Sequence, residues 1–144
     1  MAAHSTYDDV NLMLRLYDMR REEKMRMARN WFVANFKPKS MAEYNHLCPP
    51  GSDQNAMARQ VTSYWDMVAS FIQAGVLNQD LFFQTNRELL VVWCRVHPIV
   101  DEVRAAFKDP SYMKNLEVVA DAYVAYLNKI DPETFPAFKA RVGG

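Results

Sequence analysis

The stretch that decides the fold is TYDDVNLMLRLYDMRREEKMRMARNWFVANF, residues 6–36. It contains no Gly and no Pro, the two residues that most often interrupt a helix. Ser5 or Thr6 can cap its start, and the aspartates that follow suit the positive end of the helix dipole. Pro38 lies two residues past Phe36 and closes it. The stretch therefore predicts one long N-terminal helix.

Outward from this stretch, helical spacing of apolar residues recurs between caps and breakers. The expected segments are a short helix at 41–47 behind a Ser40–Glu43 capping box, a helix from 53 to Gly75, an apolar stretch from Leu81 to Phe107, a helix from Ser111 to 127 and a short last helix after Asp131-Pro132. Pro98 predicts a kink or a break at His97 within the apolar stretch. Only four Gly are present, which argues against a sheet with tight turns. We expect an all-α fold, a single-domain helical bundle of five to seven helices spanning residues 1–144.

Composition and charge exclude several classes of protein. Formal net charge is zero, so nothing global points to nucleic acid. The longest run without a charged residue, 67–79, has thirteen residues, fewer than the ~20 apolar residues of a membrane helix. The N-terminus has no basic segment followed by an apolar one, as a secretory signal would. We therefore expect a cytoplasmic protein without a transmembrane segment and without a nucleic-acid partner.

Candidate chemistry is sparse. Glu43 and His46 have the Glu-x-x-His spacing of di-iron bundles, but such sites need a second pair and further glutamates, which the chain lacks. Cys94 and His97 could face each other on one helix, yet the surrounding residues are so apolar that a core thiol is the better interpretation. Cys48 is expected to be the more accessible thiol, and both cysteines to be reduced. The sequence thus predicts no metal, no cofactor and no catalytic residue.

The first half of the N-terminal helix carries more apolar surface than one face requires. Val10, Met13, Leu14 and Tyr17 form one stripe, and Leu12, Leu16 and Met19 form a second one, displaced around the helix axis. One stripe suffices to pack on the domain's own core. The other must be covered by another helix of the chain or by another molecule. We expect Leu12, Leu16 and Met19 to form an interface.

Residues 20–39 are basic. They hold seven cations against two acids, interleaved with Met and aromatic residues, and the candidates for binding are Arg20, Arg21, Lys24, Arg26 and Arg29. The favoured interpretation is a solvated helix face in which Glu22 pairs with Arg26 four residues on. The alternative is a basic amphipathic segment for an anionic partner or membrane surface.

Several patterns together resemble a known family. They are Tyr7-Asp8-Asp9-Val10, Leu14-Arg15-Leu16-Tyr17, Arg20-Arg21-Glu22-Glu23, Trp65, Phe71, the run 75–80, Trp93, His97-Pro98-Ile99-Val100, Arg104 and the run 116–120. The chain is similar over most of its length to an uncharacterised bacterial family of helical domains, known only as a domain of unknown function. The resemblance implies an all-helical fold, with no activity and no site to carry over. Members of that family often have an N-terminal membrane helix, which this sequence does not contain.

Three functions remain open. The leading hypothesis is a non-enzymatic helical interaction module that forms a homo-oligomer through its N-terminal helix. The second is a bundle that binds a small apolar ligand among its many Met and aromatic side chains, with Trp93, Arg104 and Glu117 as a candidate inward polar set. The third is a peripheral binder of anionic surfaces through the segment 20–39.

Overall fold

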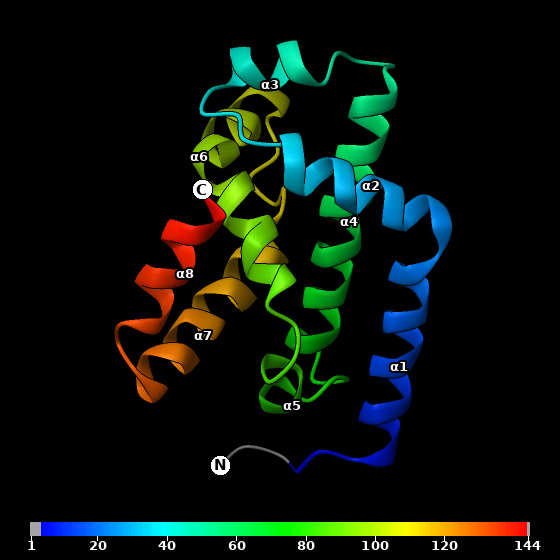
Figure 1. The fold of residues 1–144 in the computed structure, drawn as a ribbon, viewed down its shortest axis with the longest axis vertical. Helices are drawn as coiled ribbons and strands as arrows, with labels where there is room; N and C mark the ends of the chain where they lie inside the picture. The colour runs from blue at the N-terminus through cyan, green and yellow to red at the C-terminus, as the bar shows by residue number, and fades with distance from the viewer. Residues whose placement is uncertain (1–3, 144) are drawn as a thin grey trace.

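The computed structural model describes residues 4–143, and in that range the chain forms eight helices and no strand (Figure 1). The helices are α1 (Tyr7–Arg21), α2 (Glu23–Asn35), α3 (Met41–Leu47), α4 (Asp53–Gln73), α5 (Gln79–Phe83), α6 (Glu88–Phe107), α7 (Lys114–Ile130) and α8 (Thr134–Val142). The predicted all-α class is confirmed. The helix count exceeds the expected five to seven.

Helix α4 lies at the centre of the packing, between α1 and α2 on one side and α7 on the other (Figure 1). Its inward face buries Trp65 and Val68, and Tyr123 of α7 packs on the ring of Phe83 from α5. Buried apolar residues from every helix except α3 join one core cluster. The cause is the helical spacing of these residues, which places them on one side of each helix.

The expected long N-terminal helix is instead two helices. Residue Glu22 adopts an extended conformation (φ −56°, ψ 145°), and its carboxylate caps α2 by accepting the N–H of Met25 at 3.1 Å. Figure 1 shows α1 running along α4, whereas α2 crosses above it. The change of direction is also held from α2 itself, because Arg29 donates to the Arg20 carbonyl at the end of α1 (3.0 Å). Side-chain capping therefore replaces the helix bonds that the break removes.

Three further boundaries differ from expectation. The apolar stretch that begins near Leu81 is split into α5 and α6 by a turn at 84–87. Conversely, α6 continues through Pro98 without a break. Helix α7 begins at Lys114 rather than Ser111, because the residues before it form turns that end at Met113, a residue in the left-handed conformation (φ 54°).

A buried arginine joins the C-terminal ends of α2 and α8. Arg95 of α6 is 4% exposed, and its guanidinium donates to Val33 O (3.0 Å) and Phe36 O (3.1 Å) at the end of α2. The same group donates twice to Val142 O at the end of α8, at 3.0 and 2.8 Å. Cations are stabilising at helix C-termini, where carbonyls lack helix partners. The charge is therefore balanced by carbonyl groups of two helix ends.

Candidate interaction surface

Helix α1 has one face against the core and one face in solvent. On the inner face, Leu16 is 6% exposed, and its carbonyl accepts the Tyr64 hydroxyl at 2.6 Å. Asp9 is also buried there and accepts the backbone N–H groups of Thr6 and Asn78, both at 2.7 Å. These N–H groups lower the pKa of the Asp9 carboxyl. The inner face is thus fixed by polar anchors as well as by apolar contact.

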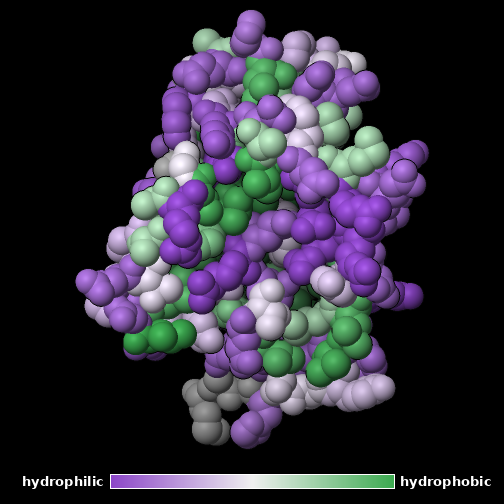
Figure 2. All heavy atoms as spheres, viewed as in Figure 1, coloured by the Kyte–Doolittle hydropathy of each residue, from purple (hydrophilic) through white to green (hydrophobic). Residues whose placement is uncertain are grey.

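The opposite face of α1 is apolar and uncovered. It consists of Tyr7, Val10, Leu14 and Tyr17, which we call the outward stripe; their exposed fractions are 78%, 42%, 57% and 45%. The four residues are spaced by three, four and three positions, so they line up along one side of the helix. Figure 2 shows apolar residues gathered at the lower right, where Figure 1 places α1. Such a continuous exposed patch is typical of an interaction surface.

The expected division into one covered and one uncovered stripe is only partly observed. In the first stripe, Val10, Leu14 and Tyr17 are exposed, whereas Met13 packs against the core. Leu16 lies in the chain's own core, and Leu12 is half-buried against that core. Met19 is 47% exposed and lines a shallow groove with Met25 and Met67. Leu16 was thus assigned to the wrong face, because the residues that cover it come from α4, distant in the sequence.

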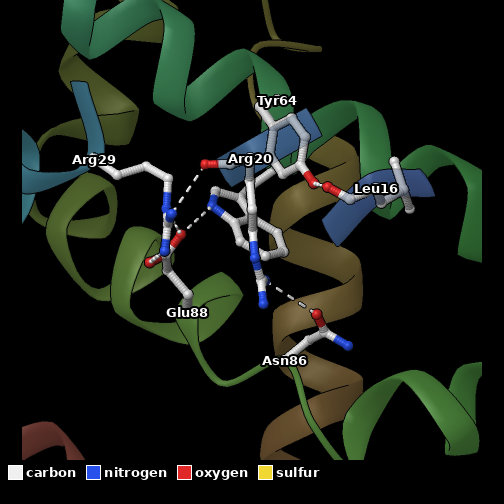
Figure 3. Close-up of polar contacts among 7 residues, drawn as sticks. Leu16, Arg20, Arg29, Tyr64, Asn86 and Glu88 are labelled. Atoms are coloured by element: carbon white, nitrogen blue, oxygen red, sulfur yellow. Dashed lines mark hydrogen bonds and ion pairs between the residues drawn. The ribbon is translucent and has the colours of Figure 1, made fainter. Parts of the chain in front are cut away.

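The start of α2 is held by a polar network at Glu88 (Figure 3). Arg29 binds the Glu88 carboxylate with two nitrogens, Nε and Nη2, both at 2.8 Å. Trp65 donates its indole N–H to the same carboxylate at 3.1 Å. Paired nitrogen-to-oxygen contacts of this kind fix geometry as well as charge. The network ties α2, α4 and α6 together beneath the α1–α2 junction.

Arg20 extends this network to α5–α6. Its guanidinium donates to Asn86 Oδ1 at 3.2 Å (Figure 3). It also lies over the rings of Tyr17 and Trp65, at 5.1 and 5.5 Å from their centroids. Two of the five predicted basic candidates, Arg20 and Arg29, are therefore engaged within the chain.

The other three candidates face solvent. Arg21 stacks on Tyr17 at 5.2 Å, while Lys24 and Arg26 are exposed and form no ion pair with any residue in 4–143. The expected pairing of Glu22 with Arg26 is wrong, since Glu22 caps α2 instead. The backbone N–H groups of Lys24 and Met25 lower the pKa of Glu22. The solvated basic surface is thus smaller than the sequence indicates.

The candidate chemical groups are dispersed. Glu43 and His46 lie exposed on α3, and the described part of the chain holds no cluster of three or more His, Cys, Asp or Glu placed for a metal. Burial raises the pKa of Cys94, and the His97 ring packs on Trp93 at 5.3 Å. Cys48 is fully buried, with its pKa raised to about 11 by burial. The expectation that Cys48 is accessible is therefore wrong.

The set Trp93, Arg104 and Glu117 is only partly brought together. Trp93 and Glu117 line a cleft of about 600 Å³ between α6, α7 and α8. Arg104 pairs with Glu117 at 3.1 Å and also donates to the Tyr112 carbonyl at 2.9 Å. Arg104 therefore holds the α6–α7 loop in place.

Sequence reasoning missed Arg95. The available signal was that Arg95 is the one charged residue between Glu88 and Asp101, within the most apolar part of the chain. A long cation in such a position requires carbonyl or carboxylate partners from other elements.

The fold and surfaces define an all-helical domain with an uncovered helix face. More specifically, residues 5–123 match the model of a family described as Domain of unknown function (DUF4760), and the chain belongs to that family. A search of the curated proteins and a search of the solved structures each find no match. Within 4–143, no helix combines the length and the apolar character needed to cross a bilayer. The resemblance inferred from the sequence is confirmed as a family of unknown function.

Proposed function

We propose that this protein is a non-enzymatic helical interaction module that self-associates through the outward stripe of α1. The observation that carries the proposal is the exposure of four aligned apolar side chains on the side of α1 opposite to the core. A soluble protein most often covers such a surface with a second copy related by two-fold symmetry.

The outward stripe suits an antiparallel partner. Its spacing is symmetric about its midpoint, so a reversed copy sets Tyr7 against Tyr17 and Val10 against Leu14. The charges favour the same direction, because α1 is acidic in its first turn and basic in its last. A reversed copy brings these opposite charges toward each other and opposes the two helix dipoles.

Light scattering over a concentration series tests the proposal. Leu14→Glu should give a folded monomer, since Leu14 is 57% exposed and is not among the residues packed against the core. Met27→Glu is the matched control: Met27 is 60% exposed, on α2 outside the stripe, and its variant should retain the wild-type mass. Circular dichroism of both variants should match the wild type.

Two results would overturn the proposal. One is a wild type that stays monomeric at high micromolar concentration. The other is a Leu14→Glu variant that retains the wild-type mass. A double change of Leu12 and Leu16 to Glu is not a suitable test, because a charge at Leu16 would be placed in the core.

Fewer observations support the two alternative functions, binding to an anionic surface and binding of a small ligand. An anionic-surface role would rest on Arg21, Lys24 and Arg26, with the exposed Lys37 and Lys39 of the same segment, and salt-dependent binding to anionic vesicles would reveal it. A small-ligand role is developed below. Four expectations from the sequence stay predictions: a bacterial origin, a cytoplasmic location, no nucleic-acid partner and no cofactor.

A further inference from the structure

A cleft of about 800 Å³ lies where the first turns of α4 meet α3 and the loop between α6 and α7. Its apolar wall includes Phe107, which is 63% exposed, and Met113. Tyr44, Tyr112 and Arg59 are among its polar lining residues, which also include Asn45, Asn55, Gln60, Thr62, Ser63 and Asp109. We call it the α4 cleft; no residue of α1 lines it, so it is independent of the outward stripe.

The α4 cleft has unused hydrogen-bond donors. Within residues 4–143, neither the Tyr44 nor the Tyr112 hydroxyl has a hydrogen-bond partner, and the Arg59 guanidinium has no hydrogen bond or ion pair. The carboxylate of Asp109, by contrast, already accepts both the N–H and the hydroxyl of Ser111. Arg59 and the two phenols therefore offer donors and one positive charge, which an acceptor with negative charge would satisfy.

The wall of the cleft is held in an unusual backbone conformation. Lys108 and Met113, at the two ends of the loop, have φ values of 53° and 54°, in the left-handed region that residues with side chains rarely adopt. Arg104 holds the loop by donating to the Tyr112 carbonyl at 2.9 Å. Strained backbone maintained by specific contacts is characteristic of binding sites. Here it positions Tyr112 and Met113 at the cleft.

We propose that the α4 cleft binds a small amphipathic carboxylate. The apolar body lies against Phe107 and Met113, and the carboxylate accepts hydrogen bonds from Arg59 and the two phenols. Burial raises the pKa of Tyr44 and of Tyr112, so both phenols keep their protons at neutral pH and act as donors. The adaptable Met side chain and the exposed ring favour an acyl chain or an aromatic ring as the apolar body.

Isothermal titration with sodium octanoate and with 1-octanol separates the two parts of the proposal. Octanoate should bind the wild type at least about tenfold more tightly than octanol, the size expected for a charge-assisted hydrogen bond. Arg59→Gln should weaken octanoate by about tenfold and leave octanol unchanged. Arg26→Gln removes an exposed arginine outside the cleft and should bind octanoate as the wild type does.

The location is tested by filling the cleft. Ala56 lines it and is exposed, so Ala56→Trp blocks the space without changing a charge. Loss of octanoate binding in a folded Ala56→Trp variant supports the site. If that variant does not fold, the Met113 methyl resonance of the wild type decides, because octanoate should shift it.

Three results overturn the inference. The first is the absence of saturable octanoate binding at millimolar concentration, and the second is equal affinity for octanoate and octanol. The third is binding outside the α4 cleft, shown by an unshifted Met113 resonance or by octanoate binding that survives in Ala56→Trp.

Discussion

Replacing Arg95 by Met should destabilise the fold strongly, because the guanidinium serves the ends of two helices at once. The change keeps the apolar stem and removes the donors to Val33 O, Phe36 O and Val142 O. An unsatisfied buried acceptor costs about 1–3 kcal/mol. Because the bonds to Val142 O are only part-buried, we expect a total loss of about 3–5 kcal/mol, out of a typical stability of about 5–15 kcal/mol.

Urea denaturation followed by circular dichroism measures this loss as a change in the free energy of unfolding. Arg95→Lys should be intermediate, since one ammonium group can reach the end of α2 or of α8 but cannot span both. Arg26→Met, an exposed arginine without an ion pair in the described residues, is the control and should change stability by less than about 0.5 kcal/mol. A loss below about 1 kcal/mol for Arg95→Met would refute the assigned role.

Three further outcomes are expected. Asp9→Asn should lower the melting temperature at neutral pH. Because the fold lowers the Asp9 pKa, the carboxylate stabilises the folded state above the ordinary pKa of 3.8, and this stabilisation is lost as pH falls through the folded-state pKa. The difference from wild type in thermal melts should therefore shrink in acid. Native labelling with a thiol reagent should be slow at both cysteines and accelerate in urea, since burial raises both pKa values. Arg29→Ala should cost about 1–3 kcal/mol in urea melts because it releases the partly buried Glu88, whereas Lys24→Ala should cost almost nothing.

The helix starts were predictable because their signals are local. Thr6 and Ser40 each accept an N–H from the first turn of their helix, in positions where the sequence predicts a cap, and Ser52 and Asn78 do the same for α4 and α5. A cap needs residues only a few positions apart. Local sequence therefore carries the class of fold and the starts of α1, α3, α4 and α5.

The break at Glu22 and the inner face of α1 were not predictable in the same way. No Gly or Pro marks the break, which depends on Arg29 reaching back to the Arg20 carbonyl. The choice between the two apolar stripes depends on Tyr64 and Asn78, which bind α1 from distant parts of the chain. The choice of the inner face is a tertiary effect that overrides the local pattern, and the break involves a tertiary contact because Glu88 of α6 holds Arg29.

The α4 cleft escaped sequence reasoning for a related reason. Tyr44, Arg59 and Tyr112 come from three separate elements and share no spacing that would group them. Each looks ordinary in its own segment, and only the fold brings their donors to one place.

The shallow anchoring of α1 has a consequence for hydrogen exchange. Helix α1 buries only Asp9 and Leu16, whereas α4 buries eight residues. Its amides should therefore exchange by local opening at a free energy well below that of global unfolding. A partner that binds α1 only in its folded state raises the free energy of this local opening in proportion to the logarithm of the partner's concentration. Amide protection in α1 should thus rise with protein concentration while protection in α4 stays constant.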